Sequence, residues 1–311
     1  MLKYEIEINF ELSDDVEKQV NQYLRTLIDN FIKDNNITSL HKIVFTDNWD
    51  KELVDFQKNY SLPIEYTDTK YGSASAKTLK VKIGKRTKCV IFYRKEMLLS
   101  MIQQEGFGVI HLFHELSHIY YFEKIGTNLD SLKKKYNTNQ DFMESSKSFG
   151  LIMWEEYFVS RYLCPYLFGS TDCYIDILGE QYKIIKRDLE EAIKDYRYSA
   201  NIDELYNLAR QQVTLLSTYM AYSCGMIRGI SDKSTSLFDE IVEILKKTTG
   251  LTGIWEKMYK IYDEIYSEFP ELNNIDIKLF ELNKLFLKIY NHFGIYPKQL
   301  KDGKLYIDVP L

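Results

Sequence analysis

The chain has 311 residues, of which 45% are hydrophobic and 27% charged, a composition typical of globular rather than disordered or fibrous proteins. Its net charge of −5 gives no reason to expect bulk attraction to nucleic acid or to an anionic membrane surface. No apolar run reaches the ~20 residues that span a bilayer, and residues 1–15 lack a basic segment followed by an apolar block. We therefore expect a cytoplasmic protein with reduced thiols at Cys89, Cys164, Cys173 and Cys224.

The first 93 residues predict a small sheet with helices between its strands. Apolar and charged residues alternate over 4–12, which favours a strand, and Ser13 followed by acidic residues favours the start of a helix. The predicted elements are a strand over 4–12, a helix over 14–33, a strand over 41–46, a helix over 51–59, and a hairpin over 77–93 that turns at residues 84–86.

The first strand of this hairpin, residues 77–83, alternates apolar residues with lysines and is predicted to be a sheet edge. A basic cluster accompanies it in an otherwise acidic protein. One interpretation is protection of the edge and solubility, and the other is a preference for acidic peptides or a contact with nucleic acid. The cluster consists of Lys77, Lys80, Lys82, Lys85, Arg86 and Lys88.

The remaining residues favour helices. A helical pattern covers 97–124, although Gly106 and Gly108 could delay its start to about residue 107, and a second helix is predicted over 148–163. Apolar stripes at helical spacing follow over 175–196, 254–269 and 279–293, and only 305–309 favours a strand. We expect an α+β fold with an α+β domain over 1–168 and a helical domain over 169–311.

Residues 114–118 read His-Glu-Leu-Ser-His and carry the most specific chemical signal. On a helix, His114 and His118 lie on one face, so both imidazoles can bind one metal ion. Glu115 is rotated by about 100° from His114, which suits a general base that holds a metal-bound water. The chain has only five histidines, so this pattern is improbable by chance. The structural alternative is a helix whose histidines are ordinary polar groups.

This pattern resembles the zinc metallopeptidases of the zincin superfamily, over about residues 42–165. The resemblance implies a zincin-like small mixed sheet with an active-site helix, one catalytic Zn²⁺ ion, and a peptide or protein substrate. It also implies that the substrate lies antiparallel to an edge strand, for which residues 77–83 are the candidate. In that mechanism zinc activates a water, Glu115 takes its proton, and Glu115 then passes the proton to the leaving amine.

A catalytic zinc site needs a third protein ligand. The metzincin pattern is excluded, because Tyr121 and Lys124 occupy the positions of its glycine and third histidine, and a distal histidine could only be His292. A carboxylate remains, and residues 154–161 resemble the second helix of gluzincins. Glu156, 38 residues after His118, is the predicted ligand, and Glu155 is the alternative. The unused carboxylate could orient an imidazole. The usual gluzincin aspartate four residues later is replaced by Ser160.

The sequence therefore predicts a zinc-dependent metallopeptidase with His114, His118 and Glu156 as ligands and Glu115 as base. In this prediction the domain over 1–168 is the zincin-like catalytic domain, and the helical domain over 169–311 closes the active-site cleft. Candidates for stabilising the oxyanion are His111, one turn before His114, and Tyr219 and Tyr222 on a later apolar helix. Two other functions stay open. One is a regulatory or protein-interaction protein with a zincin fold and little general proteolysis, suggested by the large helical second half. The other is a zinc hydrolase that does not act on peptides.

Overall fold

The computed structural model describes residues 3–64, 68–69, 72–103, 106–125, 127–137, 146–166, 173–231, 239, 242–243, 245–246, 249–300 and 305–310. Packing groups the chain into two compact units, Met1–Lys124 and Ile125–Leu311. The first unit combines a sheet with helices and the second is mostly helical, which confirms the predicted α+β class. None of the helices in the described part of the chain has the length and apolar character to cross a bilayer.

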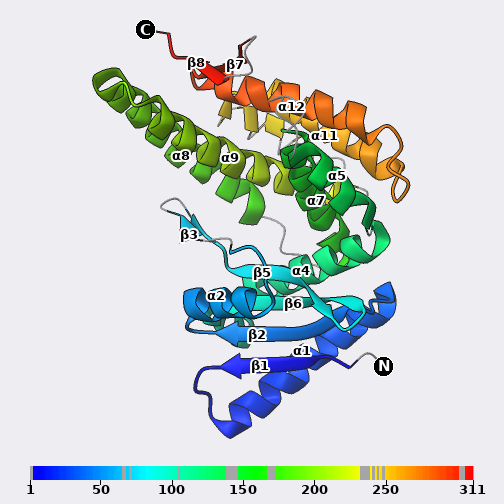
Figure 1. Ribbon diagram of the computed structural model, residues 1–311. Coiled ribbons are helices and arrows are strands. Elements are labelled where there is room, and N and C mark those ends of the chain that lie inside the picture. Colours follow the sequence, from blue (N-terminus) through cyan, green and yellow to red (C-terminus); the bar gives the residue numbers. More distant parts are fainter. Residues whose placement is uncertain are drawn as a thin grey trace. The chain divides into compact units, whose positions relative to one another are not determined.

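The first unit is built on a four-stranded mixed sheet in the order β1-β2-β6-β5, which Figure 1 shows from bottom to top. β1, β2 and β6 run parallel, and β5 is antiparallel to β6 at the edge of the sheet. The elements of this unit are β1 (Glu5–Asn9), α1 (Asp14–Asn35), β2 (Leu40–Thr46), α2 (Trp49–Asn59), the short pair β3 (Asp68–Thr69) and β4 (Gly72–Ser73), β5 (Ala76–Ile83), β6 (Arg86–Arg94), α3 (Lys95–Ile102) and α4 (Gly106–Ile125).

Alternate residues of the strands enter two different cores. The core on the α2 side holds Val44, Trp49, Leu53, Leu79, Val81, Val90 and Phe92. On the opposite face, Phe45 stacks on Tyr93 with ring centroids 5.1 Å apart, and α1 meets α4 there through a 5.6 Å contact between Phe31 and Phe113. Because side chains alternate along a strand, residues 78 and 80 of β5 face the α4 side.

The predicted hairpin is confirmed, with Gly84 in the left-handed region (φ +60) at its turn. β1 is shorter than the predicted strand. The helical pattern over 97–124 belongs to two helices, α3 and α4, and α4 begins at Gly106, next to the alternative start predicted at about residue 107. Gly108 lies inside α4 rather than breaking it. A Cβ on Gly108 would lie 2.6 Å from the carbonyl oxygen of Met97, so this glycine permits the close approach of α4 to α3.

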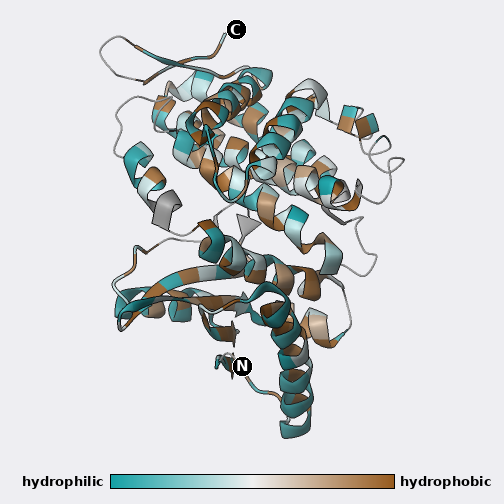
Figure 2. Ribbon diagram, turned by 90° about the vertical axis from the view of Figure 1, so that its right-hand side faces the viewer, coloured by the Kyte–Doolittle hydropathy of each residue, from teal (hydrophilic) through white to brown (hydrophobic). Residues whose placement is uncertain are grey.

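The second unit confirms the predicted helices, and Figure 2 shows the mixture of apolar and polar residues along them. The predicted last strand, β8, pairs with a strand that the sequence pattern did not indicate, β7. The elements are α5 (Thr127–Asn137), α7 (Lys147–Leu163), the 3₁₀ helix η1 (Cys164–Tyr166), α8 (Cys173–Ser199), α9 (Ile202–Ser231), α11 (Thr252–Ser267), α12 (Ile275–His292), β7 (Tyr296–Gln299) and β8 (Leu305–Asp308).

Helix α7 packs closely against α9, because two glycines of α9 face it. A Cβ on Gly225 would lie 2.3 Å from the carbonyl oxygen of Tyr157, and one on Gly229 would lie 2.5 Å from Cys164 Sγ. Packing therefore places α7 in the helical unit, whereas the sequence predicts a domain boundary after residue 168.

Among the described thiols, Cys89, Cys164 and Cys224 are buried, and burial raises the pKa of Cys89 to about 11. The side chain of Cys173 lies outside the described residues.

Candidate metal centre

Helix α4, which carries the HExxH motif, is an interior helix. Leu112, Leu116 and Ile119 are fully buried. Ser117 is also buried and donates from Oγ to the carbonyl oxygen of Phe113 over 2.7 Å, so its hydroxyl needs no partner outside the helix. Apolar packing around α4 thus fixes the backbone from which the motif side chains project.

The last turn of α4 is tied to the start of β2 by one carboxylate oxygen. Glu123 Oε1 accepts from the backbone N–H groups of Thr38 and Ser39 over 2.8 and 2.6 Å, and from Ser39 Oγ over 2.5 Å. A charged acceptor with three donors forms short and strong hydrogen bonds. Glu123 therefore holds the C-terminal end of the motif helix against the sheet.

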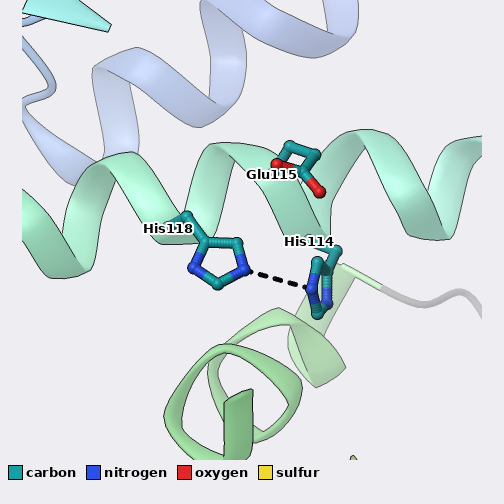
Figure 3. A group of neighbouring side chains, drawn as sticks. All are labelled: His114, Glu115 and His118. Atoms are coloured by element: carbon teal, nitrogen blue, oxygen red, sulfur yellow. Dashed lines mark hydrogen bonds between the residues drawn. The ribbon is translucent and has the colours of Figure 1, made fainter. Parts of the chain in front are cut away.

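The two motif histidines face each other on one side of α4, with their Nε2 atoms 3.2 Å apart (Figure 3). Two nitrogens bound at about 2.05 Å to one tetrahedral zinc ion would be about 3.3 Å apart. The observed separation therefore fits a shared ion. It also fits an N–H···N hydrogen bond between two neutral rings, which is the geometry of the metal-free alternative.

Glu115 completes the cluster. One of its carboxylate oxygens and one nitrogen from each of His114 and His118 lie within 4.8 Å of one another. Glu115 is only 7% exposed and leaves the helix at a different angle from the two imidazoles (Figure 3). Its Oε2 accepts a hydrogen bond from Thr78 Oγ1 over 2.6 Å. The donor set of two imidazoles and one carboxylate suits zinc and several neighbouring divalent ions.

His111, a predicted oxyanion donor, is neutral at physiological pH, because burial lowers its pKa to about 4. Its Nδ1 lies 2.9 Å from the carbonyl oxygen of Phe107, so Nδ1 carries the proton and donates it. In this tautomer Nε2 has a lone pair and no hydrogen. The arrangement does not favour His111 as an oxyanion donor.

The other predicted site residues lie on helices of the second unit. Glu155 and Glu156 are half-buried on α7 between the buried aromatic residues Trp154 and Tyr157. Glu155 forms an ion pair with Lys133, with Nζ and Oε2 3.1 Å apart. Glu156 stays a prediction as the third ligand.

The remaining oxyanion candidates and the distal histidine also lie in the second unit. Tyr219 and Tyr222 lie on α9 with their ring centroids 6.1 Å apart. The role of either residue as an oxyanion donor stays a prediction. His292 Nε2 lies 2.9 Å from the hydroxyl of Tyr182, so its ring nitrogen contacts a phenol of its own unit.

Three members of the basic cluster make contacts within the first unit. Lys82 Nζ donates to Thr87 Oγ1 over 2.8 Å, and Lys88 Nζ donates to the carbonyl oxygen of Thr38 over 2.7 Å. Lys80 Nζ lies 4.4 Å from the centre of the Phe122 ring. These contacts favour the structural interpretation of the cluster, in which the lysines protect and stabilise an edge hairpin.

Comparison with protein-family models, with curated protein sequences and with solved structures gives no match. The geometry of His114, Glu115 and His118 is therefore the feature from which a function can be inferred. Two residues that hold this geometry, Thr78 and Glu123, were not predicted. The sequence places Thr78 on the predicted edge strand, on the face opposite to Leu79 and Val81. The contact of Thr78 with Glu115 is seen only in the structure.

Proposed function

We propose that this chain is a zinc-dependent metallopeptidase in which His114 and His118 bind the metal and Glu115 is the general base. The observation that carries the proposal is the 3.2 Å separation of two Nε2 atoms beside a buried carboxylate. Two histidines serving only as polar groups would not need a carboxylate of the same helix within 4.8 Å of both rings.

A bound zinc ion would supply Lewis acidity, activating a water and polarising the scissile carbonyl. The protein residues would do the rest. Glu115 accepts the proton from the water and later donates it to the leaving amine. Because Glu115 is nearly excluded from solvent, its charge acts in a low-dielectric environment, where electrostatic interactions are stronger than in water.

The substrate in this proposal is a peptide in extended conformation. β5 is the outer strand of the sheet next to β6, and its residue Thr78 contacts Glu115 directly. A peptide that pairs with β5 through backbone hydrogen bonds would therefore lie along the same strand that reaches the general base. Such pairing gives affinity with little demand on the peptide sequence.

Glu156 is the proposed third ligand, with Glu155 as the alternative. The ion pair of Glu155 with Lys133 gives that carboxylate a role within its own unit. The two residues offer a matched pair of variants. Glu156→Gln should lose zinc, whereas Glu155→Gln should retain it, as measured by equilibrium competition with a zinc-binding dye.

The test of the function measures zinc and turnover in the same variants. The wild-type protein should hold one equivalent of zinc and cleave unfolded casein. Glu115→Gln should keep the zinc but lose turnover by about 10²–10⁴-fold, because it cannot accept the proton. His118→Ala should lose the zinc, whereas His41→Ala, a control on β2, should keep it. Full activity in Glu115→Gln would contradict the base assignment.

The regulatory alternative predicts a different result in the same experiment. A protein that keeps the fold for interaction only would hold zinc but would not cleave casein or a broad peptide library. A zinc hydrolase of another class would cleave ester or amide probes but not peptides. A protein without zinc, whose melting temperature does not change when zinc is added, would refute the metal centre.

A further inference from the structure

Thr78, on the edge strand β5, contacts the proposed general base directly. Its Oγ1 donates to Glu115 Oε2 over 2.6 Å, a short distance that is typical of a hydroxyl bound to a charged oxygen. The two residues are 37 positions apart in the sequence, so the bond joins the sheet edge to the motif helix. Within the described residues, the Glu115 carboxylate accepts its hydrogen bond from Thr78.

The register of the sheet explains why the hydroxyl reaches Glu115. Leu79 and Val81 pack into the core on the α2 side, so the side chain of Thr78 leaves the strand toward α4. Thr78 pairs with Ile91 in a ladder that runs the full length of β5. Threonine is β-branched and has few χ1 rotamers, so a fixed backbone also restricts the position of its hydroxyl.

This bond restricts a side chain that is otherwise adaptable. Ordering a glutamate side chain costs rotamer entropy, and a hydrogen bond present before substrate arrives removes part of that cost from the reaction. The bond occupies Oε2 and leaves Oε1 to accept a proton. Because Glu115 is buried, the bond is stronger than the same contact at the surface.

We propose that Thr78 is a positioning residue that holds the Glu115 carboxylate in its working orientation; this inference rests on the proposed role of Glu115 as general base. Loss of the Thr78 hydroxyl should lower kcat about 10- to 100-fold, as is typical when an outer-shell partner of a metal site is removed. KM and zinc affinity should stay unchanged, because Thr78 is not a metal ligand and a side-chain substitution leaves intact the β5 backbone groups that would pair with the peptide.

Three variants separate positioning from a purely structural role. Thr78→Val keeps the shape and removes the hydroxyl, and Thr78→Ser keeps the hydroxyl. Thr87→Val is the matched control, because Thr87 lies on the other strand of the hairpin and its hydroxyl accepts from Lys82 instead. Each zinc-loaded variant is assayed for kcat and KM on a fluorogenic casein peptide pool and for its Kd for acetohydroxamate. This probe chelates zinc and gives its proton to a carboxylate beside the metal, so it reports on Glu115 without turnover.

The expected result is a Thr78→Val protein with wild-type zinc affinity, a kcat about 10- to 100-fold lower, and acetohydroxamate binding weakened by about 10-fold. Thr78→Ser should restore both values, and Thr87→Val should match the wild type. Wild-type kcat and acetohydroxamate affinity in Thr78→Val would overturn the inference. A Thr78→Val protein that loses both stability and zinc affinity would also overturn the inference, because the bond would then have a purely structural role.

Failure of the inference is distinguishable from failure of the proposed function. If Thr78→Val behaves as wild type while Glu115→Gln keeps zinc and loses turnover, Glu115 remains the base and only the role of Thr78 falls. If the wild-type protein binds neither zinc nor acetohydroxamate, the metal centre itself is wrong and the inference falls with it.

Discussion

Gly225 is the position where one added methyl group should have the clearest effect on the second unit. In a Gly225→Ala variant the new Cβ would lie 2.3 Å from the carbonyl oxygen of Tyr157 and 2.9 Å from the backbone nitrogen of Arg161. Cβ contacts in proteins essentially never fall below 3.0 Å, so α9 and α7 must separate by at least 0.7 Å at this point. Both contacts involve backbone, so no side-chain rotation relieves them.

The magnitude follows from two opposing effects. Overpacking of this kind costs about 1–3 kcal/mol, with the upper value expected where backbone atoms collide. Alanine stabilises a helix interior by about 1 kcal/mol relative to glycine. We therefore expect Gly225→Ala to lower the free energy of unfolding by about 2 kcal/mol. Gly253→Ala, in the first turn of α11 with no atom within 4 Å of its Cβ, is the matched control and should be neutral or slightly stabilising.

Urea unfolding monitored by circular dichroism measures both variants. We expect a lower midpoint for Gly225→Ala and an unchanged or higher midpoint for Gly253→Ala. Equal midpoints for the two proteins would refute the argument that α7 and α9 are in backbone contact at Gly225.

Three further predictions concern the rest of the molecule. Glu123→Ala should lower the free energy of unfolding of the first unit by about 2–3 kcal/mol in urea, because the backbone N–H and hydroxyl of buried Ser39 lose a charged acceptor. A change below about 0.5 kcal/mol would contradict a stabilising role for these hydrogen bonds. Burial raises the pKa values of Tyr93, Tyr157 and Tyr262 above the ordinary value of 10.0, so the folded state binds more protons than the unfolded chain above about pH 10 and stability should fall as pH rises. The absorbance of tyrosinate should then rise steeply at the pH at which the protein unfolds. Complete ionisation of the tyrosines near pH 10, with the circular dichroism spectrum still native, would contradict this prediction. In a Cys173→Ser background, native Cys89 should not react with a thiol reagent at about pH 8, because burial raises its pKa to about 11, and rapid labelling of Cys89 would show that it is accessible.

Local patterns were enough to predict much of the first unit. The hairpin followed from alternating residues around Gly84, and the motif helix followed from the i, i+4 spacing of its histidines. Gly106 and Gly108 indicated a helix start at about residue 107, next to the observed start of α4, but the separate helix α3 was not distinguished from it. Gly108 lies inside α4, where the absence of a side chain permits close contact with the backbone of Met97. This contact depends on tertiary packing and not on the local sequence. β7 was not predicted because it is short, contains Pro297 and lacks apolar alternation.

The predicted site was only partly accessible from the sequence. His114, Glu115 and His118 share one helix, so helical geometry alone predicts that they cluster, and the structure confirms the cluster. Thr78 contacts a residue 37 positions away in the sequence, and Glu123 contacts residues up to 85 positions away. No local sequence pattern predicts contacts over such separations. Glu156 depends on a contact between separate elements and therefore stays a prediction.

The most direct test of the metal centre is an anomalous difference map at the zinc absorption edge, from crystals of the zinc-loaded protein. We predict one peak about 2.0–2.1 Å from Nε2 of both His114 and His118, with a Glu156 carboxylate oxygen as the third protein ligand. A map without a peak between the two imidazoles, at a zinc concentration that saturates the protein in solution, would contradict the account.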